Sequence, residues 1–485
     1  MSESVVVLDA AALRDAGREP ATPFRVTLAD GNEVVVSRLL RVLPGKRVVG
    51  EGLWRGRRVL VKLFVGGASA RHWRQEKAGV EALLNAGILT PDLLLATSLP
   101  AGGHVLLTRY LDAAQSLAQA WLPVADLSAG HAVALDVLRP AFRVLGAMHA
   151  AGLVQQDLHL GNFLRCADVV FVIDGDAVRT ITPGKPLDEP LATRNLAILL
   201  AQLPIAWDAC RDALLDAYRA GGGFSLSETA RLEDEVARVR TWRLKDFLGK
   251  TLRDCTLFAV RCSAFRFTAV ARGEADRLAP LLKSPDEAIR RGVLLKDGRT
   301  CTVAQVELAG SALIVKRYNL KNLPHFLERC WRPSRAWHSW REGHRLRFLG
   351  ISTPEPLALI EERAGPLRRR AFLVCEYCPG SNLLDLLSPD QEPAGDVARA
   401  IVSLFSTLYV QRISHGDLKA TNLLFHDGKV VVIDLDAVRQ HGTENSYVRA
   451  WRRDRERLLR NWPESSTLRQ WLDTHLPPAS RSTQR

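Results

Sequence analysis

Two stretches of the chain carry three polar residues at one fixed spacing. Each has an aspartate, an asparagine five positions later and a second aspartate twelve positions after that: Asp157, Asn162 and Asp174 in one stretch, and Asp417, Asn422 and Asp434 in the other. The second aspartate ends a β-branched run, FVIDGDAVR or VVIDLDAVR, and the pattern of a hairpin lies between it and the asparagine. Because the whole set recurs, we interpret it as an internal repeat.

These residue types suit the transfer of a phosphoryl group. Mg²⁺ bridges phosphate oxygens and prefers hard oxygen ligands, so four residues are predicted to bind it: Asn162, Asp174, Asn422 and Asp434. The remaining aspartate of each set, Asp157 or Asp417, would orient an acceptor hydroxyl and take its proton. This order and spacing, with a hairpin before the last aspartate, is the pattern of a kinase.

In a kinase, a segment that binds nucleotide should precede each set of polar residues. The sequence before the first set has the features of such a segment. Gly50 and Gly52 lie between two strand-like runs, and the second run ends in Lys62. Glycines let the backbone approach phosphates closely, and a lysine on the next strand can pair with them. A helical pattern follows, and Glu76 near its start could hold Lys62 in position. We therefore predict that these four residues bind the cofactor.

The second set has a less complete version. Lys316 ends a comparable strand, and Glu342 lies on the helical pattern that follows. No glycine pair precedes Lys316, and Glu342 lies three residues nearer a shared Gly-Ile-x-Thr-Pro motif than Glu76 does, so it is free to point elsewhere. The first set departs downstream instead, with two glutamines where the second has His415-Gly416. Lys316 and Glu342 are still predicted to contact nucleotide.

The length and composition of the chain indicate the class of protein that carries these motifs. A chain of 485 residues, 47% hydrophobic and 25% charged, is typical of a soluble protein with two or more domains. No apolar run reaches the ~18–20 residues of a membrane span, and no export signal is expected. The net charge is +13, and the stretch RAWRRDRERLLRNW is rich in arginine. That stretch is either a solvated helix face or a surface for a polyanion.

The set Lys62, Glu76, Asp157, Asn162 and Asp174, with its Ile-Asp-x-Asp ending, resembles the bacterial lipopolysaccharide core kinases. These are the Kdo and heptose kinases of the WaaP type, distant relatives of the protein-kinase fold. The second half, from about Leu282 to Trp462, is similar to another member of the family. The resemblance implies an α+β fold of two tandem protein-kinase-like units, each with a small antiparallel β-sheet lobe and a larger helical lobe. We place the units at residues 1–260 and 261–485.

The resemblance also implies a function. The protein would use ATP and Mg²⁺ to phosphorylate a heptose or Kdo of the lipopolysaccharide inner core, with the core or a lipid A precursor as its partner and no nucleic acid. It would be cytoplasmic and work peripherally at the inner face of the inner membrane. Short connections after Asp174 and Asp434 favour a non-protein acceptor.

Several alternatives stay open. Either unit could be a pseudokinase that serves as scaffold or regulator of core assembly. A small-molecule phosphotransferase of the aminoglycoside or choline type is suggested by the pattern Asp157-x-His159-x-Gly-Asn162. The sequence does not fix the sugar, its hydroxyl, the acting unit or the oligomeric state.

Overall fold

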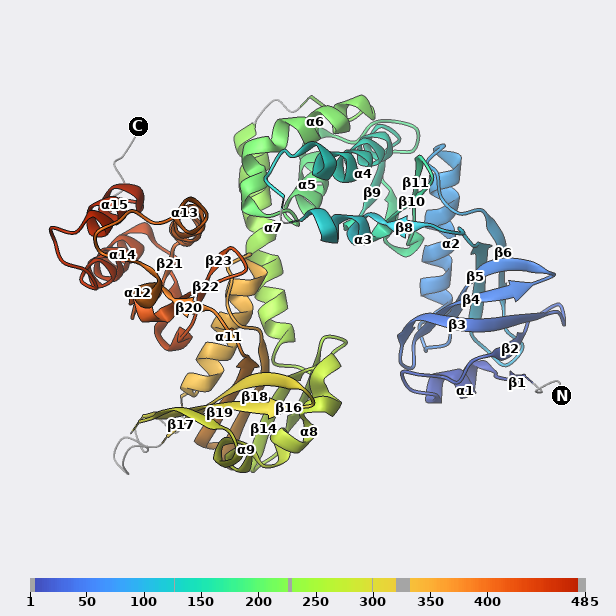
Figure 1. The fold of residues 1–485 in the computed structure, drawn as a ribbon. Coiled ribbons are helices and arrows are strands. Elements are labelled where there is room, and N and C mark those ends of the chain that lie inside the picture. Colours follow the sequence, from blue (N-terminus) through green and yellow to red (C-terminus); the bar gives the residue numbers. More distant parts are fainter. Residues whose placement is uncertain (1–4, 126, 226–228, 299, 320–331, 479–485) are drawn as a thin grey trace. The chain divides into compact units, whose positions relative to one another are not determined.

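The computed structural model describes all residues except 1–4, 126, 226–228, 299, 320–331 and 479–485 (Figure 1). The chain divides into two compact units, Met1–Thr241 (unit 1) and Trp242–Arg485 (unit 2). The division falls within helix α7 (Thr229–Lys250), earlier than the boundary at 260 that we placed from the sequence. It lies there because Phe247, near the end of α7, packs with Phe258 in a core cluster of unit 2.

Unit 1 begins with a seven-stranded sheet in the order β1-β2-β3-β4-β5-β7-β6. Apart from the parallel pair β1–β2, neighbouring strands are antiparallel. Alternate residues of β2 and β4 are buried, which is the period-two pattern of strands with one face on a core. The elements of this lobe are β1 (Val6–Val7), α1 (Ala10–Asp15), β2 (Phe24–Thr27), β3 (Glu33–Leu43), β4 (Arg47–Trp54), β5 (Arg57–Phe64), α2 (Ser69–Asn85), β6 (Leu93–Ser98) and β7 (His104–Arg109).

The second lobe of unit 1 is helical, and its core is built around the buried, apolar face of α4 (Ala132–Ala150). Two small sheets carry the polar motif: β8 (Gln115–Ser116) with the hairpin β10–β11 (Phe163–Cys166 and Val169–Val172), and β9 (Leu153–Gln155) with β12 (Val178–Thr180). The other helices are α3 (Leu117–Trp121), α5 (Glu189–Leu200), α6 (Arg211–Ala220) and the first part of α7.

Unit 2 repeats this plan with a fully antiparallel sheet in the order β13-β14-β18-β19-β17-β16-β15. The helix of this lobe, α11, packs on the sheet through Trp340, which is fully buried. The elements are β13 (Phe258–Cys262), β14 (Arg266–Ala271), α8 (Ala275–Lys283), α9 (Pro285–Arg291), β15 (Val293–Asp297), β16 (Cys301–Leu308), β17 (Ser311–Tyr318), α11 (Arg335–Phe348), β18 (Pro356–Ala364) and β19 (Leu367–Glu376).

The helical lobe of unit 2 also carries its polar motif on two small sheets. These are β20 (Ser381–Asn382) with the hairpin β22–β23 (Leu423–His426 and Lys429–Val432), and β21 (Ile413–Ser414) with β24 (Arg439–Gln440). The helices are α12 (Leu383–Leu386), α13 (Gly395–Val410), α14 (Glu444–Leu459) and α15 (Thr467–His475). The predicted α+β class, with a sheet lobe and a helical lobe in each unit, is confirmed. Among the described residues, no helix is long and apolar enough to cross a membrane.

Candidate active site

In unit 1 the structure brings Lys62 and Glu76 together. Lys62 lies on β5 and Glu76 on α2, and their side chains form an ion pair in which the glutamate side chain is only 1% exposed. The Lys62 Nζ also lies 3.7 Å from Oδ1 of Asp174. A buried charge needs a partner, and here the lysine has one on each side. The pair therefore fixes an ammonium group beside the aspartate that was predicted to bind Mg²⁺.

Helix α2 reaches this position by lying very close to the turn Gly175–Ala177 (η3). Glu76 accepts hydrogen bonds from the backbone N–H groups of Gly175 and Asp176, at 3.1 and 3.2 Å. One helical turn further on, a Cβ at Gly79 would lie 1.9 Å from the Gly175 carbonyl oxygen. Glycine is therefore required at residue 79, because any side chain would push the helix off the turn.

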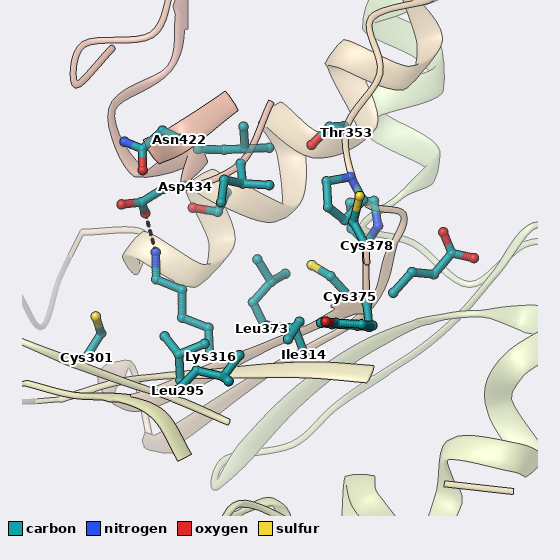
Figure 2. Close-up of a pocket in the computed structure, with 18 of the residues that line it drawn as sticks. Leu295, Cys301, Ile314, Lys316, Thr353, Leu373, Cys375, Cys378, Asn422 and Asp434 are labelled. Carbon is teal, nitrogen blue, oxygen red and sulfur yellow. Dashed lines mark hydrogen bonds and ion pairs between the residues drawn. The ribbon is translucent and has the colours of Figure 1, made fainter. Parts of the chain in front are cut away.

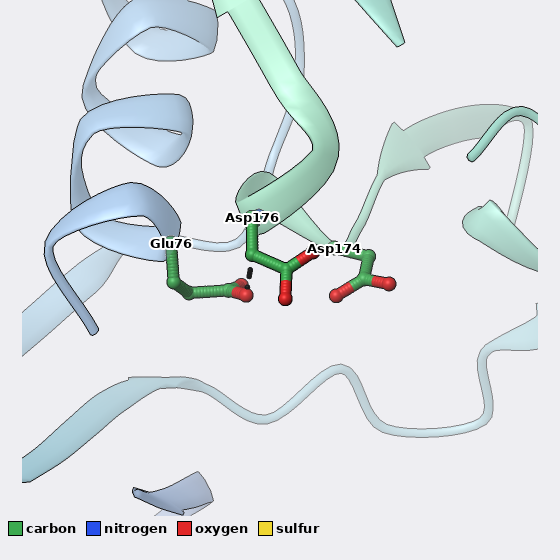
Figure 3. A group of neighbouring side chains, drawn as sticks. All are labelled: Glu76, Asp174 and Asp176. Atoms are coloured by element: carbon green, nitrogen blue, oxygen red, sulfur yellow. Dashed lines mark hydrogen bonds between the residues drawn. The ribbon is translucent and has the colours of Figure 1, made fainter. Parts of the chain in front are cut away.

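Three carboxylates gather at this turn. Glu76, Asp174 and Asp176 each offer an oxygen, and these oxygens lie within 4.8 Å of one another (Figure 3). Burial and the negative charges of Asp174 and Glu76 raise the pKa of Asp176. Arg47 supplies one compensating charge, with its Nη1 3.0 Å from Asp176. An oxygen-only donor set with excess negative charge fits a hard cation such as Mg²⁺.

The rest of the unit 1 motif is held by its own loop. The Asn162 side chain donates to the Asp157 carbonyl oxygen at 2.7 Å, which leaves its amide oxygen available as a ligand. Asp174 has a φ of 71°, a left-handed conformation that is uncommon for residues other than glycine and often marks a functional site. Asp157 is exposed to solvent. The loop of Asp157 and Asn162 thus holds the predicted amide ligand, and Lys62 lies beside Asp174.

Two buried residues of this site could not be found from the sequence. Asn195 on α5 accepts from the Gln155 N–H at 3.3 Å and donates to the Gln155 carbonyl at 2.8 Å. His149 lies behind it, with Nε2 3.0 Å from the Asn195 side-chain oxygen and Nδ1 2.8 Å from the Tyr218 hydroxyl. Burial lowers the pKa of His149 to about 4, so it is neutral at pH 7. This network anchors the strand that leads into Asp157.

The predicted glycines Gly50 and Gly52 lie in β4, and both are buried against β3. A Cβ at Gly52 would lie 2.4 Å from the Val35 carbonyl oxygen, and one at Gly50 would lie 2.8 Å from that of Arg38. Close approach of strand β3 accounts for glycine at these two positions. Their assignment to the nucleotide stays a prediction.

In unit 2 the lysine has different partners. The Lys316 Nζ lies 2.5 Å from Oδ1 of Asp434 and 2.9 Å from Oδ1 of Asp436, and Figure 2 shows the first contact. Glu342, predicted from the sequence to contact nucleotide, pairs instead with Arg345 of its own helix at 2.7 Å. Ser339 lies eleven residues before Gly350, as Glu76 lies before Gly87. Glu342 is therefore one helical turn beyond the position that faces the lysine.

Asp436 takes the place of the missing helix glutamate. It accepts hydrogen bonds from the Tyr318 hydroxyl at 2.7 Å and the Ser339 hydroxyl at 2.8 Å, besides pairing with Lys316. Burial works to raise the pKa of Asp436, but the charge of Lys316 and the hydrogen bond from Tyr318 outweigh it and hold the pKa below its usual value. This carboxylate is thus ionised and committed to the lysine. The sequence analysis did not identify this role.

The loop that carries Asp417 in unit 2 matches the loop that carries Asp157 in unit 1. The Asn422 side chain donates to the Asp417 carbonyl at 2.9 Å, and Asp434 has a φ of 60°. The Asp417 carboxylate pairs with Lys419 at 3.1 Å and with Arg457 at 3.0 Å. Buried Asp454, on α14, accepts the backbone N–H groups that precede Asp417, at 2.6 and 3.0 Å.

A cavity of about 340 Å³ opens between the two lobes of unit 2 (Figure 2). One end is polar and includes Lys316, Asn422 and Asp434, and the rest is apolar, with Ile314 and Leu373 among its lining residues. The cysteines Cys301, Cys375 and Cys378 also line it. Burial raises the pKa of Cys375 to about 12, so it stays a neutral thiol that packs as an apolar group. A largely apolar pocket with a few convergent polar groups is typical of a small-molecule site.

Parts of this chain are similar to known proteins. Residues 297–475 match the model described as the lipopolysaccharide kinase (Kdo/WaaP) family. Among solved structures, one described as WaaP in complex with acyl carrier protein is 20% identical, with a TM-score of 0.27; the match covers 44% of this chain and 82% of that one. A structure of vaccinia related kinase 3 is 11% identical, with a TM-score of 0.28, and the match covers 48% of this chain and 96% of that one. The similarity to the lipopolysaccharide kinase (Kdo/WaaP) family thus covers residues 297–475, which lie within unit 2.

Proposed function

We propose that the protein phosphorylates a heptose or Kdo of the lipopolysaccharide inner core, with ATP as phosphoryl donor and Mg²⁺ as metal. One observation carries this proposal: in both units a strand lysine, an asparagine fixed by the catalytic loop and a left-handed strand-end aspartate meet in one site. The family match of residues 297–475 directs the activity toward lipopolysaccharide.

The residues divide the work as follows. Lys62 and Lys316 would bind ATP phosphates as point charges, and Glu76 or Asp436 would hold each ammonium in place. The metal ligands would be Asn162 with Asp174 and Asn422 with Asp434. Bound Mg²⁺ would neutralise charge on the transferred phosphoryl group.

The remaining aspartate of each loop would act on the acceptor. Asp157 or Asp417 would accept the proton of the sugar hydroxyl as its oxygen bonds to the γ-phosphorus and the bond to ADP breaks. The apolar part of the unit 2 cavity would take the adenine ring.

A glycan acceptor is supported by the chain that follows each metal aspartate. In unit 1, residues 181–188 connect β12 to α5, and in unit 2 only residues 441–443 connect β24 to α14. Protein kinases use a long segment there to bind a peptide. A lipid-linked core sugar would be met at the cytoplasmic face of the inner membrane, where ATP is present, and we propose peripheral association there.

A second candidate is that unit 2 acts as a pseudokinase supporting unit 1. It is favoured by Ser339 at the helix position of the glutamate, and by the two ion pairs that engage Asp417.

The test is phosphate analysis of core oligosaccharide from a deletion strain that carries the wild-type gene, Asp157→Ala, Asp417→Ala or both. Loss of core phosphate in the deletion strain, restored by the wild-type gene, is expected. Restoration by Asp417→Ala but not by Asp157→Ala would establish the second candidate. Full phosphate content without the gene would refute the proposed substrate.

A further inference from the structure

A second cavity of unit 2, about 480 Å³, lies beside β24 and the N-terminal half of α14. We call it the arginine pocket. Its lining residues are Arg439, Gln440, His441, Gly442, Ser446, Arg449 and Arg453. Three guanidinium groups line this one hollow and no carboxylate does. The three arginines are solvent-exposed, and a cluster of one sign at a hollow raises the local positive potential and attracts anions.

The three arginines differ from their neighbours on α14. Arg455 pairs with Asp473 at 2.8 Å and Arg457 pairs with Asp417 at 3.0 Å, so both are occupied within the fold. Within the described part of unit 2, no ion pair engages Arg439, Arg449 or Arg453. The Arg449 Nε donates to the Asn445 carbonyl at 3.2 Å, which orients the side chain and leaves its terminal nitrogens for a ligand.

The pocket is tied to the catalytic loop. Arg439 lies opposite Ser414 in the β21–β24 pair, and Ser414 is three residues before Asp417 in the sequence. His441 links the parts: Nε2 lies 2.8 Å from the Ser414 hydroxyl and Nδ1 lies 2.9 Å from the Ser446 hydroxyl. Burial, together with the positive charges of Arg439 and Arg453, lowers the pKa of His441. The histidine thus acts as a neutral bridge that sets the pocket's position relative to the loop.

We infer that the arginine pocket binds a phosphate ester, and that the acceptor of unit 2 is a sugar already attached to a phosphorylated group. Guanidinium forks match phosphate oxygens with paired hydrogen bonds, and three of them suit a phosphate group better than the single charge of a carboxylate. The first half of the inference stands on the pocket alone. The second half rests on the proposed function, because it takes unit 2 to hold an acceptor beside Asp417.

Unit 1 does not carry the same pocket residues. Arg179 follows Asp174 by five positions, as Arg439 follows Asp434, but its Nη1 donates to the carbonyls of Asp176 and Val178 at 2.7 Å. Seven positions after its metal aspartate unit 1 has Ile181, where unit 2 has His441. Phosphate binding of this kind is therefore expected from unit 2 only.

The binding test uses the full chain and inorganic phosphate in isothermal titration, with a non-hydrolysable ATP analogue and Mg²⁺ already bound. Arg449→Gln combined with Arg453→Gln removes two of the three guanidinium groups. Arg452→Gln is the matched control, because Arg452 is exposed on the same helix and does not line the pocket. We expect the double variant to bind phosphate roughly tenfold or more weakly than the control. Equal affinity in the double variant and the control would overturn the inference.

Two further arms identify the source of the phosphate. If it belongs to the acceptor, the double variant should raise KM for phosphorylated core acceptor roughly tenfold with kcat held, and inorganic phosphate should compete with that acceptor. If it belongs to a lipid headgroup, phosphatidylglycerol vesicles should instead bind the control better than the double variant, which would overturn the acceptor assignment. An inactive wild-type chain that still shows the difference in phosphate binding would refute the proposed function and leave the pocket established.

Discussion

The two units hold the same lysine in different ways. In unit 1 the acid that fixes Lys62 comes from helix α2, as Glu76, while in unit 2 the acid that fixes Lys316 comes from the turn after the metal aspartate, as Asp436. Both arrangements leave the ammonium group next to the strand-end aspartate. The comparison teaches that the position of the ammonium is the shared feature, and that the loss of one acidic residue does not by itself mean the loss of a site.

The exchange also changes the charge balance. Asp176 of unit 1 lies among carboxylates and its pKa is raised, whereas Asp436 of unit 2 lies against a lysine and its pKa is lowered. The unit 1 cluster would therefore attract a divalent cation more strongly than the corresponding groups of unit 2. In unit 2, Lys316 offsets part of the negative charge of Asp434 and Asp436.

The largest effect is expected from the candidate bases. Asp157→Ala and Asp417→Ala should each lower phosphoryl transfer by their own unit by roughly 10²–10⁴-fold, because a positioned base contributes about that much to rate. Nucleotide affinity should change little, since lysine and metal hold ATP. Labelled-phosphate transfer to core oligosaccharide and calorimetry with an ATP analogue separate the two quantities. Wild-type turnover in both single variants and in the double variant would show that neither aspartate acts as a base.

The next effect is on stability, at the lysine partners. Glu76→Gln should destabilise unit 1 by about 3–5 kcal/mol, because it removes the charge of a carboxylate that is 1% exposed and leaves Lys62 with only the longer 3.7 Å contact to Asp174. Asp436→Asn should destabilise unit 2 by only about 1–2 kcal/mol, because Lys316 keeps Asp434. Denaturant unfolding of the two variants measures both values. The control is Glu81→Gln, an exposed helix residue with a weak i,i+4 pair, which should cost below about 0.5 kcal/mol. A larger loss for Asp436→Asn than for Glu76→Gln would reverse the comparison.

Ser339→Glu should test whether the two arrangements are interchangeable. The Ser339 hydroxyl lies 2.8 Å from Asp436, so a glutamate there would set two carboxylates side by side, at a cost of about 1–3 kcal/mol. Adding Asp436→Asn should recover most of that loss, because the new glutamate could then pair with Lys316 as Glu76 pairs with Lys62. A double-mutant cycle with thermal unfolding measures the recovery. Additive losses in the cycle would show that α11 cannot place an acid at the lysine.

The smallest effect is on pH dependence, and its sign differs between the units. The pKa of Asp436 is lowered, so its contribution to stability is present above pH 3.8 and is lost as pH falls through the folded-state value. The pKa of Asp176 is raised, so its contribution is present below pH 3.8 and is lost as pH rises through the folded-state value. In EDTA, acidification should therefore shrink the Tm advantage of wild type over Asp436→Asn. It should increase the advantage of wild type over Asp176→Asn. Changes of the same sign in both variants would contradict the assigned environments.

Local spacing was enough to predict part of the site. The fixed intervals between aspartate and asparagine identified residues that the structure brings together, because a hairpin of fixed length must return the chain to the same edge. Glu76 lies eleven residues before Gly87, whereas Glu342 lies only eight residues before Gly350. The same count from Gly350 gives Ser339 as the counterpart of Glu76. The role of Asp436 was not visible, since a residue after a strand reads equally well as a turn cap.

Long-range partners could not be predicted. Asn195 and Asp454 anchor the catalytic loops from helices roughly 40 residues downstream, and no local pattern marks them. The added strands β1, β2, β13 and β14 at the sheet edges were not predicted either. The basic stretch of α14 was interpreted as either a solvated helix face or a surface for a polyanion, but its arginines differ: Arg453 lines a pocket, whereas Arg455 and Arg457 pair with acids. Which arginines are free depends on what packs against each helix face.

The glycine at residue 79 has a consequence for how the two units came to differ. Because Gly79 has no side chain, α2 packs directly against the turn that follows Asp174. This close packing brings Glu76 of the helix within reach of Lys62. In unit 2 the corresponding position, eight residues before Gly350 instead of Gly87, is Glu342, which turns along its helix toward Arg345. In unit 2, where this position carries a side chain, the acid that pairs with the lysine comes from the turn, as Asp436. The size of one residue thus decides whether the helix or the turn supplies the counter-ion of the lysine.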